Sequence, residues 1–297
     1  MDVDAAFVLV DKASGWTSHD VVNKARRIFG MKKIGHAGTL DPMATGLIVL
    51  GLGKATRLLR FLQGQSKEYV TTAMFGVATD SLDADGAILD RTPMEISEAD
   101  VAGVLGRFTG DIMQVPPMVS AIQIGGRRLY ALAREGKEID RPLRPVTVHR
   151  IDVESFAPGP YPEVTIRVVC STGTYIRTLA DDIARALGGR SHLTALRRVR
   201  NGALEVRNAW SVDELSELGV VDRLDEVTLH PSTTLSHMPL VEIDKAMMVQ
   251  ARNGARLPAA LLGVESADEF VRVVGEGRLV GVYRVERKEL VAEVVLA

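Results

Sequence analysis

One loop combines residue types that could do chemistry. Residues 35–46 read GHAGTLDPMATG, so His36 and the carboxylate of Asp41 stand among glycines, directly ahead of Pro42. Proline restricts the residue before it to extended backbone angles, which limits the direction of Asp41, and glycine lets another backbone approach closely. This loop is therefore the first candidate site. The structural alternative is that Asp41 caps a short helix beginning at Pro42 and that His36 is a surface residue.

Three further clusters place an aromatic or apolar side chain beside cations. Tyr69 ends the tripeptide KEY, Tyr175 and Arg177 stand in CSTGTYIRTL, and Leu196 begins the tripeptide LRR. Thr174 is a candidate N-cap for a helix whose first turns present Tyr175 and Arg177. The structural alternative is that the aromatic and apolar side chains belong to the core and that the arginines lie on solvated faces.

Other familiar chemistries find no support in the sequence. Residues 51–56 (GLGKAT) do not match the phosphate-binding P-loop motif GxxxxGK[ST]. Ile48 stands where the motif has its first glycine, and Ala55 stands where it has a serine or threonine hydroxyl. No GxGxxG follows a strand, the six histidines show neither HxxxH nor HExxH spacing, and no GxSxG occurs. The single cysteine, Cys170, excludes a CxxC zinc site and an intramolecular disulfide. We therefore expect no metal and no cofactor.

The composition is that of an ordinary globular protein. The chain has 297 residues, 46% hydrophobic and 25% charged, which excludes a disordered chain, a collagen and a coiled coil. No apolar run reaches about 18 residues, so we expect no membrane span. The apolar run near the N-terminus is too short and wrongly flanked for a signal peptide. Together with the single cysteine, these features predict a cytoplasmic protein.

Charge is segregated along the chain although the net charge is only −2. Residues 20–60, 127–150 and 177–207 are rich in lysine and arginine, whereas residues 80–100 and 213–226 are acidic. If the basic segments meet in the fold, they form a cationic face that attracts phosphate backbones. The alternative is that each basic run is a solvated helix face paired with an acidic neighbour.

Both helices and strands are predicted among the elements that position these candidate residues. The patterns predict a helix capped by Ser18 and ended by Gly30, and further helices at 54–63, 97–107, 129–136 and 175–187, the second of these opened by a capping box of Ser97 and Asp100. They predict strands at 47–52, 67–76, 146–156, 164–170 and 193–200. Strands and helices follow one another without a steady strand–helix–strand alternation. This favours an α+β fold over a doubly wound parallel sheet.

The pattern changes near Pro231. A short apolar stretch at 240–243 and a short helix at 245–253 are followed by strand-like runs at 269–274, 278–285 and 290–296. We therefore predict two domains, residues 1–231 and residues 232–297, the second a small β-rich module such as a compact barrel.

The motifs together resemble the TruB-type tRNA pseudouridine synthases. In family order, over about 200 residues, the sequence carries DKASG (11–15), GHAGTLDPMATGLIVLGLGKATR (35–57), KEY (67–69), Asp80 followed by DADG (83–86), PPMVSA (116–121), GTYIR (173–177) and LRR (196–198). Two departures are visible. Ala13 stands where proline is expected, and residues 119–123 read VSAIQ where Tyr and Lys are frequent at the first and last positions.

The resemblance implies a pseudouridine-synthase fold, with a mixed, mainly antiparallel central sheet flanked by helices and a PUA-like RNA-binding tail. It implies isomerisation of uridine 55 in the T-loop of tRNA, with Asp41 as the catalytic aspartate and Arg177 paired with its carboxylate. It implies that four further residues bind the substrate: His36 holds the T-arm loop open, Tyr69 stacks on the target uracil, and Tyr175 and Leu196 line the base pocket.

This chemistry agrees with the absence of cofactor motifs, because the isomerisation transfers no electrons. An ionised carboxylate could attack either the uracil ring or the ribose C1′, and the sequence leaves both routes open. The expected partner is the tRNA T-arm, and we expect a monomer with no obligate protein partner. Two other functions stay open: a non-catalytic RNA-binding protein such as a tRNA folding chaperone, and a synthase acting on another structured RNA.

Overall fold

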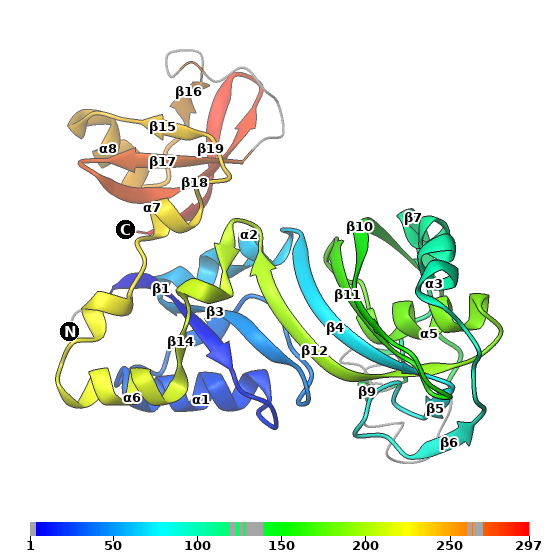
Figure 1. Ribbon diagram of the computed structural model, residues 1–297. Coiled ribbons are helices and arrows are strands. Elements are labelled where there is room, and N and C mark those ends of the chain that lie inside the picture. Colours follow the sequence, from blue (N-terminus) through cyan, green and yellow to red (C-terminus); the bar gives the residue numbers. More distant parts are fainter. Residues whose placement is uncertain are drawn as a thin grey trace. The chain divides into compact units, whose positions relative to one another are not determined.

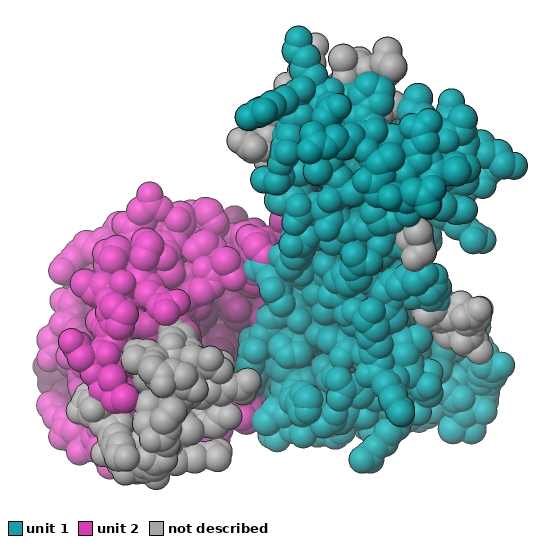
Figure 2. Space-filling view, turned by 180° about the vertical axis from the view of Figure 1, so that it is seen from behind, with its two compact units in different colours: residues 1–41, 47–63, 202–297 teal, residues 42–46, 64–201 magenta. Residues whose placement is uncertain are grey.

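The computed structural model describes residues 4–118, 123–124, 127–128, 139–259, 263 and 270–296. It divides into two compact units (Figure 2). Unit 1 comprises residues 1–41, 47–63 and 202–297, and unit 2 comprises residues 42–46 and 64–201. Both units mix helices and strands (Figure 1), which confirms the predicted α+β class. The helix predicted at 129–136 lies outside the described residues.

Unit 2 is built on a sheet with the strand order β12–β4–β11–β10–β7. These strands are β4 (Lys67–Phe75), β7 (Gly110–Gln114), β10 (Arg144–Ala157), β11 (Glu163–Cys170) and β12 (Ser191–Asn201). All these neighbours pair antiparallel. The first two residues of β3 (Thr45–Gly53) pair parallel with β12. The sheet is therefore mixed and mainly antiparallel, as predicted.

Among the described residues, two helices cover this sheet. They are α3 (Glu98–Leu105), which is followed by the 3₁₀ turn η2 (Gly106–Phe108), and α5 (Ile176–Ala186). Helix α5 packs on β12 and β4, and α3 packs on β10 and on α5. Strand β11 buries every second side chain, the pattern of a strand with one face in a core. Ser97 caps α3 in a capping box with Asp100, as predicted.

Smaller strands complete unit 2. They form two hairpins, β5 (Val77–Thr79) with β6 (Ile88–Arg91), and β8 (Gln123–Ile124) with β9 (Arg127–Arg128). The loop that joins β5 to β6 is the acidic segment that begins at Asp80.

The N-terminal part of unit 1 has the strand order β14–β1–β3, with β2 on β3. Its elements are β1 (Ala5–Lys12), α1 (Ser18–Ile28), β2 (Ile34–His36), η1 (Lys54–Leu58), α2 (Leu59–Gln63), β13 (Leu204–Glu205), η3 (Val206–Asn208), β14 (Trp210–Ser211), α6 (Val212–Val220) and η4 (Leu224–Val227). Strands β1 and β3 are continuous apolar runs because their side chains are buried on both faces.

Two predicted helix starts differ from the structure. The N-cap of α1 is Thr17, whose hydroxyl accepts from the Asp20 amide while the Asp20 carboxylate accepts from Thr17, and Ser18 is the first helical residue. The helix predicted at 54–63 begins as the 3₁₀ turn η1 and becomes α-helical only at Leu59. Such tight first turns are frequent at helix N-termini.

The C-terminal part of unit 1 is a small β-rich module, as predicted. Its sheet has the order β15–β17–β18–β19–β16. The elements are α7 (Pro231–Thr234), β15 (Leu240–Glu242), α8 (Lys245–Arg252), β16 (Leu257–Pro258), β17 (Phe270–Gly275), β18 (Arg278–Glu286) and β19 (Glu289–Val295). The domain boundary at Pro231 stays a prediction.

This module has its own core and shares a second one with the N-terminal part of unit 1. Val271, Val273 and Leu290 belong to the first core. In the second core the ring of Phe61 from α2 meets that of Phe270 from β17 edge-on, with 5.2 Å between the ring centres. Because both cores are apolar, the module is held by hydrophobic packing.

Helix α5 carries a carboxyl group that opposes folding when ionised. Burial, and then the neighbouring charge of Asp181, raise the pKa of Asp182 to about 6. An unfolded aspartate has a pKa near 3.9, so the folded state holds the Asp182 proton more tightly than the unfolded state. The stability that this protonated carboxyl contributes is fully present below about pH 3.9 and is lost as the pH rises through about 6. Because Asp182 is partly exposed and solvent screens its charge, we expect Asp182→Asn to be more stable than the wild type at pH 8 by about 1 kcal/mol, and equally stable at pH 3.5. Urea unfolding at the two pH values measures this, and equal stabilities at pH 8 would contradict it.

Candidate active site

The loop that carries Asp41 forms no helix. Residues 37–44 connect β2, which ends at His36, to β3, which begins at Thr45, and the chain bends at Pro42 and Met43. The alternative in which Asp41 caps a helix is therefore wrong. Asp41 and His36 are both half-buried.

Hydrogen bonds within unit 1 fix the chain on the N-terminal side of Asp41. The Leu40 amide donates to Ser18 Oγ at 2.8 Å, and the Leu40 side chain is buried. Earlier in the loop, the Ala37 amide donates to the Val49 carbonyl at 2.9 Å. With its predecessor fixed and with proline after it, Asp41 has little backbone freedom, which suits a carboxylate that must be aimed.

Gly46 lets β3 run beside β12. It has φ +101°, and a Cβ at this position would lie 2.3 Å from the backbone oxygen of Arg198. No larger residue fits there without moving the backbone. The glycine that ends the sequence motif is therefore needed where the loop joins the sheet of unit 2.

Tyr69 and Leu196 lie on one face of that sheet. Tyr69 is opposite Arg198 in the β4–β12 pair, and Leu196 is opposite Thr71. Because residues two apart on a strand share a face, Tyr69 and Leu196 are diagonal neighbours, within reach of an aromatic ring. Leu196 is buried and Tyr69 is half-buried, so the pair offers an apolar edge with one accessible ring.

Tyr175 is held through its backbone. It is the N-cap of α5 and makes no side-chain capping bond. Its amide donates to Gln114 Oε1 at 3.0 Å, and its carbonyl accepts from Gln114 Nε2 at 3.3 Å. Thr174 instead donates to the Ser171 carbonyl, so its predicted role as the cap is wrong. Gln114, buried on β7, is a positioning residue that the sequence did not reveal.

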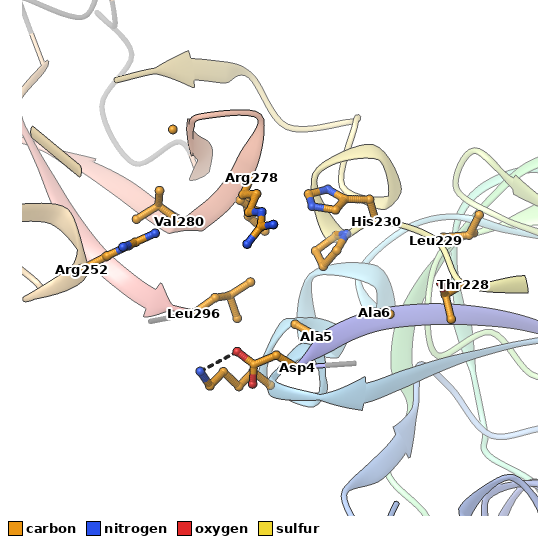
Figure 3. Close-up of a pocket in the computed structure, with 14 residues that line it drawn as sticks. Asp4, Ala5, Ala6, Thr228, Leu229, His230, Arg252, Arg278, Val280 and Leu296 are labelled. Carbon is orange, nitrogen blue, oxygen red and sulfur yellow. Dashed lines mark hydrogen bonds and ion pairs between the residues drawn. The ribbon is translucent and has the colours of Figure 1, made fainter. Parts of the chain in front are cut away.

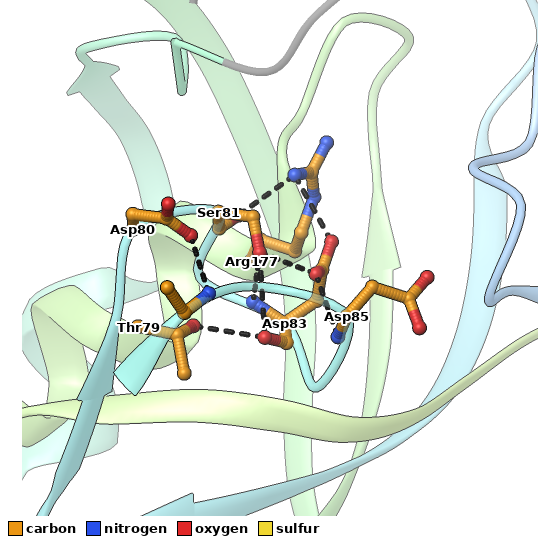
Figure 4. A network of polar contacts seen from close by, with 7 residues as sticks. Thr79, Asp80, Ser81, Asp83, Asp85 and Arg177 are labelled. Atoms are coloured by element: carbon orange, nitrogen blue, oxygen red, sulfur yellow. Dashed lines mark hydrogen bonds and ion pairs between the residues drawn. The ribbon is translucent and has the colours of Figure 1, made fainter. Parts of the chain in front are cut away.

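Arg177 lies in a buried polar network (Figure 4). Its side chain is only 3% exposed. Its Nη1 donates to the Ser81 carbonyl at 2.8 Å and to Asp83 Oδ2 at 3.2 Å. Because a buried charge must be paired, Asp83 fixes the position of the guanidinium.

Asp83 is in turn fixed by its own loop. Its Oδ1 accepts from Ser81 Oγ and from the Asp85 amide, and its carbonyl accepts from Thr79 Oγ1. The sequence showed Asp83 as part of the family motif but gave it no role. The signal was a run of aspartates with a glycine, DADG, which favours a tight loop rich in side chain–backbone bonds.

The predicted site residues fall in both units. His36 and Asp41 belong to unit 1, and Tyr69, Tyr175, Arg177 and Leu196 belong to unit 2. The pairing of Asp41 with Arg177 stays a prediction. Since a guanidinium carries five N–H donors, the contacts that Nη1 makes with Ser81 and Asp83 are compatible with a second carboxylate partner.

Basic side chains surround the start of β4. Burial, and then the charge of Arg198, lower the pKa of Lys67 to about 8. Burial raises the pKa of the Cys170 thiol to about 11, which disfavours the nucleophilic thiolate at neutral pH.

Among the described residues, no group of three or more His, Cys, Asp and Glu side chains is placed to hold a metal ion. No helix in that part of the chain is both long and apolar enough to span a membrane.

Comparisons with known proteins agree with the resemblance seen in the sequence. Residues 26–176 match the family model described as TruB family pseudouridylate synthase (N terminal domain). The tRNA pseudouridine synthase B of Paenarthrobacter aurescens is 45% identical over 272 residues, covering 90% of this chain and 88% of that protein. The tRNA pseudouridine synthase B of Mycobacterium leprae is 41% identical over 298 residues. This match covers 97% of the present chain and 90% of that protein.

A solved structure has the same fold. A chain in the crystal structure of a Cbf5–Nop10–Gar1 complex superposes with a TM-score of 0.76 and 25% identity. The match covers 99% of the present chain and 86% of that chain.

The Asp83–Arg177 pair yields a stability prediction. Asp83→Asn keeps the shape but removes a carboxylate countercharge from the buried guanidinium, so we expect a loss of about 3 kcal/mol in the free energy of unfolding. The matched control is Asp85→Asn, since Asp85 lies in the same loop and is exposed. We expect the control to stay within about 0.5 kcal/mol of the wild type in chemical denaturation. Equal losses in the two variants would show that the Asp83 carboxylate does not stabilise Arg177.

Proposed function

We propose that this chain, which belongs to the TruB family of pseudouridylate synthases, isomerises uridine 55 in the T-loop of tRNA to pseudouridine. One observation carries the proposal furthest: relatives named tRNA pseudouridine synthase B match along about nine-tenths of both chains. The directed carboxylate of Asp41 and the shared face of Tyr69 and Leu196 suit this reaction.

The reaction exchanges one bond to the ribose for another. The bond between uracil N1 and ribose C1′ breaks, a bond between uracil C5 and C1′ forms, C5 loses its proton and N1 gains one. No electrons enter or leave. An ionised carboxylate placed at the base can carry this exchange through a covalent intermediate. We assign that role to Asp41, by attack on either the uracil ring or C1′.

Arg177 keeps the nucleophile ionised in this proposal. An opposite charge within a few ångströms favours the charged form of a carboxylate and orients it. Asp83 holds Arg177 through Nη1, so the guanidinium is positioned before substrate binds. Such preorganisation lowers the cost of reaching the transition state.

The remaining site residues bind the base. A base in the folded T-loop must leave its stack, which costs a few kcal/mol. Stacking of the uracil on the ring of Tyr69 offsets about 1–3 kcal/mol of this unstacking cost. Leu196 and Tyr175 would line the pocket that receives the uracil, and His36 would occupy the space left in the T-loop.

We further propose that residues 232–297 form a PUA-like module that binds RNA. We expect the protein to act on tRNA as a monomer in the cytoplasm, without an obligate protein partner and without a cofactor.

The substrate assignment is tested by mapping pseudouridine in three RNAs after incubation with the purified protein. These are an unmodified tRNA transcript, a T-arm minihelix and a ribosomal RNA fragment. We expect a single new pseudouridine at position 55 of the tRNA, the corresponding product in the minihelix, and none in the ribosomal fragment. Equal conversion of the ribosomal fragment would contradict the choice of tRNA. Conversion at another tRNA position would contradict the choice of uridine 55.

A further inference from the structure

A pocket of about 680 Å³ lies in unit 1 (Figure 3). Its lining comes from three stretches of chain: the N-terminal residues 4–6 with Lys54, the connection at 228–231, and the C-terminal module through Arg252, Gly275, residues 278–280 and Leu296. None of the six predicted site residues lines it. Its function is therefore not explained by the chemistry proposed above.

Hydrogen bonds and an ion pair join the segments of chain that line this pocket. Arg57 Nη1 donates to the Val295 carbonyl at 2.7 Å, and Arg60 forms an ion pair with Glu293 at 2.6 Å. Leu229 and Phe7 exchange two backbone hydrogen bonds, at 2.7 and 3.0 Å. These contacts, with the shared apolar core, preorganise the pocket for a ligand.

Basic side chains dominate its charged lining. The lining contains three cationic side chains, Lys54, Arg252 and Arg278, and one carboxylate, Asp4, so the pocket has a formal charge of +2 in a chain whose net charge is −2. Lys54 Nζ is held by Asp4 Oδ2 at 2.8 Å. Within the described part of the chain, the side chains of Arg252 and Arg278 make no ion pair and no hydrogen bond, and both residues are exposed. Two arginines are thus available to a ligand.

His230 adds a neutral donor. The Ser232 amide donates to His230 Nδ1 at 3.2 Å, so the ring proton is on Nε2. Burial, and then the charge of Arg278, lower the pKa of His230, which keeps the ring neutral at neutral pH. Two guanidinium groups, an ammonium and an imidazole N–H are donors suited to the oxygens of a phosphate.

We propose that this pocket binds a phosphate group of the RNA substrate at a point separate from the target uridine. The inference rests on the proposed function, since an RNA substrate brings a phosphate with every nucleotide. A free phosphate or a small phosphorylated metabolite offers the same oxygens, so the experiment must separate the two sources.

The first measurement uses the full-length protein with the double substitution Arg252→Gln and Arg278→Gln. The matched control is Arg256→Gln with Arg287→Gln, which removes two exposed arginines from the same module but outside the pocket. The Kd for an unmodified tRNA transcript is measured across a series of salt concentrations.

We expect the pocket variant to bind about tenfold more weakly than the wild type. We expect the slope of log K against log salt to fall in magnitude by about 1. Equal losses of affinity in the two variants, or none in the pocket variant, would overturn the proposal.

The second measurement separates the sources of phosphate. Inorganic phosphate is titrated into the wild type and the pocket variant and followed by NMR. We expect millimolar binding, with shifts at residues 228–231 and 278–280 that vanish in the pocket variant. Micromolar phosphate binding together with unchanged tRNA affinity of the variant would make this a site for a small phosphorylated ligand and overturn the RNA assignment.

These outcomes are distinct from a failure of the proposed function. If the wild type forms no pseudouridine in tRNA, the proposed function is wrong whatever the pocket binds. If the wild type is active and the pocket variant binds tRNA normally, only the inference about the pocket is wrong.

Discussion

A guanidinium in a protein interior must be paired, and the arrangement of unit 2 around Arg177 follows from that requirement. The loop after β5 folds so that Asp83 and the Ser81 carbonyl meet the Arg177 side chain. Helix α5 must then begin at Ile176, directly after a tyrosine whose backbone Gln114 holds from β7. One buried charge thus ties together a loop, a helix N-terminus and an edge strand. The same contacts fix the residues that the proposed mechanism needs to be rigid.

Local patterns predicted most of the elements. The apolar run at 47–52 and the alternating run at 164–170 are strands β3 and β11, and Ser97 caps α3 as its spacing with Asp100 indicated. The errors are also local. Two neighbouring residues, Thr17 and Ser18, could each cap α1, and the structure uses Thr17 for the cap and Ser18 to hold Leu40.

What the sequence could not reveal depends on contacts between distant residues. Asp83 is 94 positions from Arg177, and Gln114 is 61 positions from Tyr175. Nothing in the neighbourhood of either residue signals its partner. The charge pattern was limited in the same way. A basic segment does not show which of its cations can bind a ligand, because the fold decides which of them lie near a carboxylate. Lys54 is held by Asp4, whereas Arg252 and Arg278 converge from separate elements on one pocket.

We propose that the carboxylate of Asp41 isomerises uridine without a cofactor. Forming the bond between C5 and C1′ must expel the hydrogen from C5, so tritium placed at C5 of uridine in a tRNA transcript is released to water. The most direct measurement compares this release for the wild type and for Asp41→Asn, with no cofactor added. The account predicts release by the wild type, none by the variant, and similar tRNA affinity for both. Tritium release by Asp41→Asn at a rate near that of the wild type would contradict it.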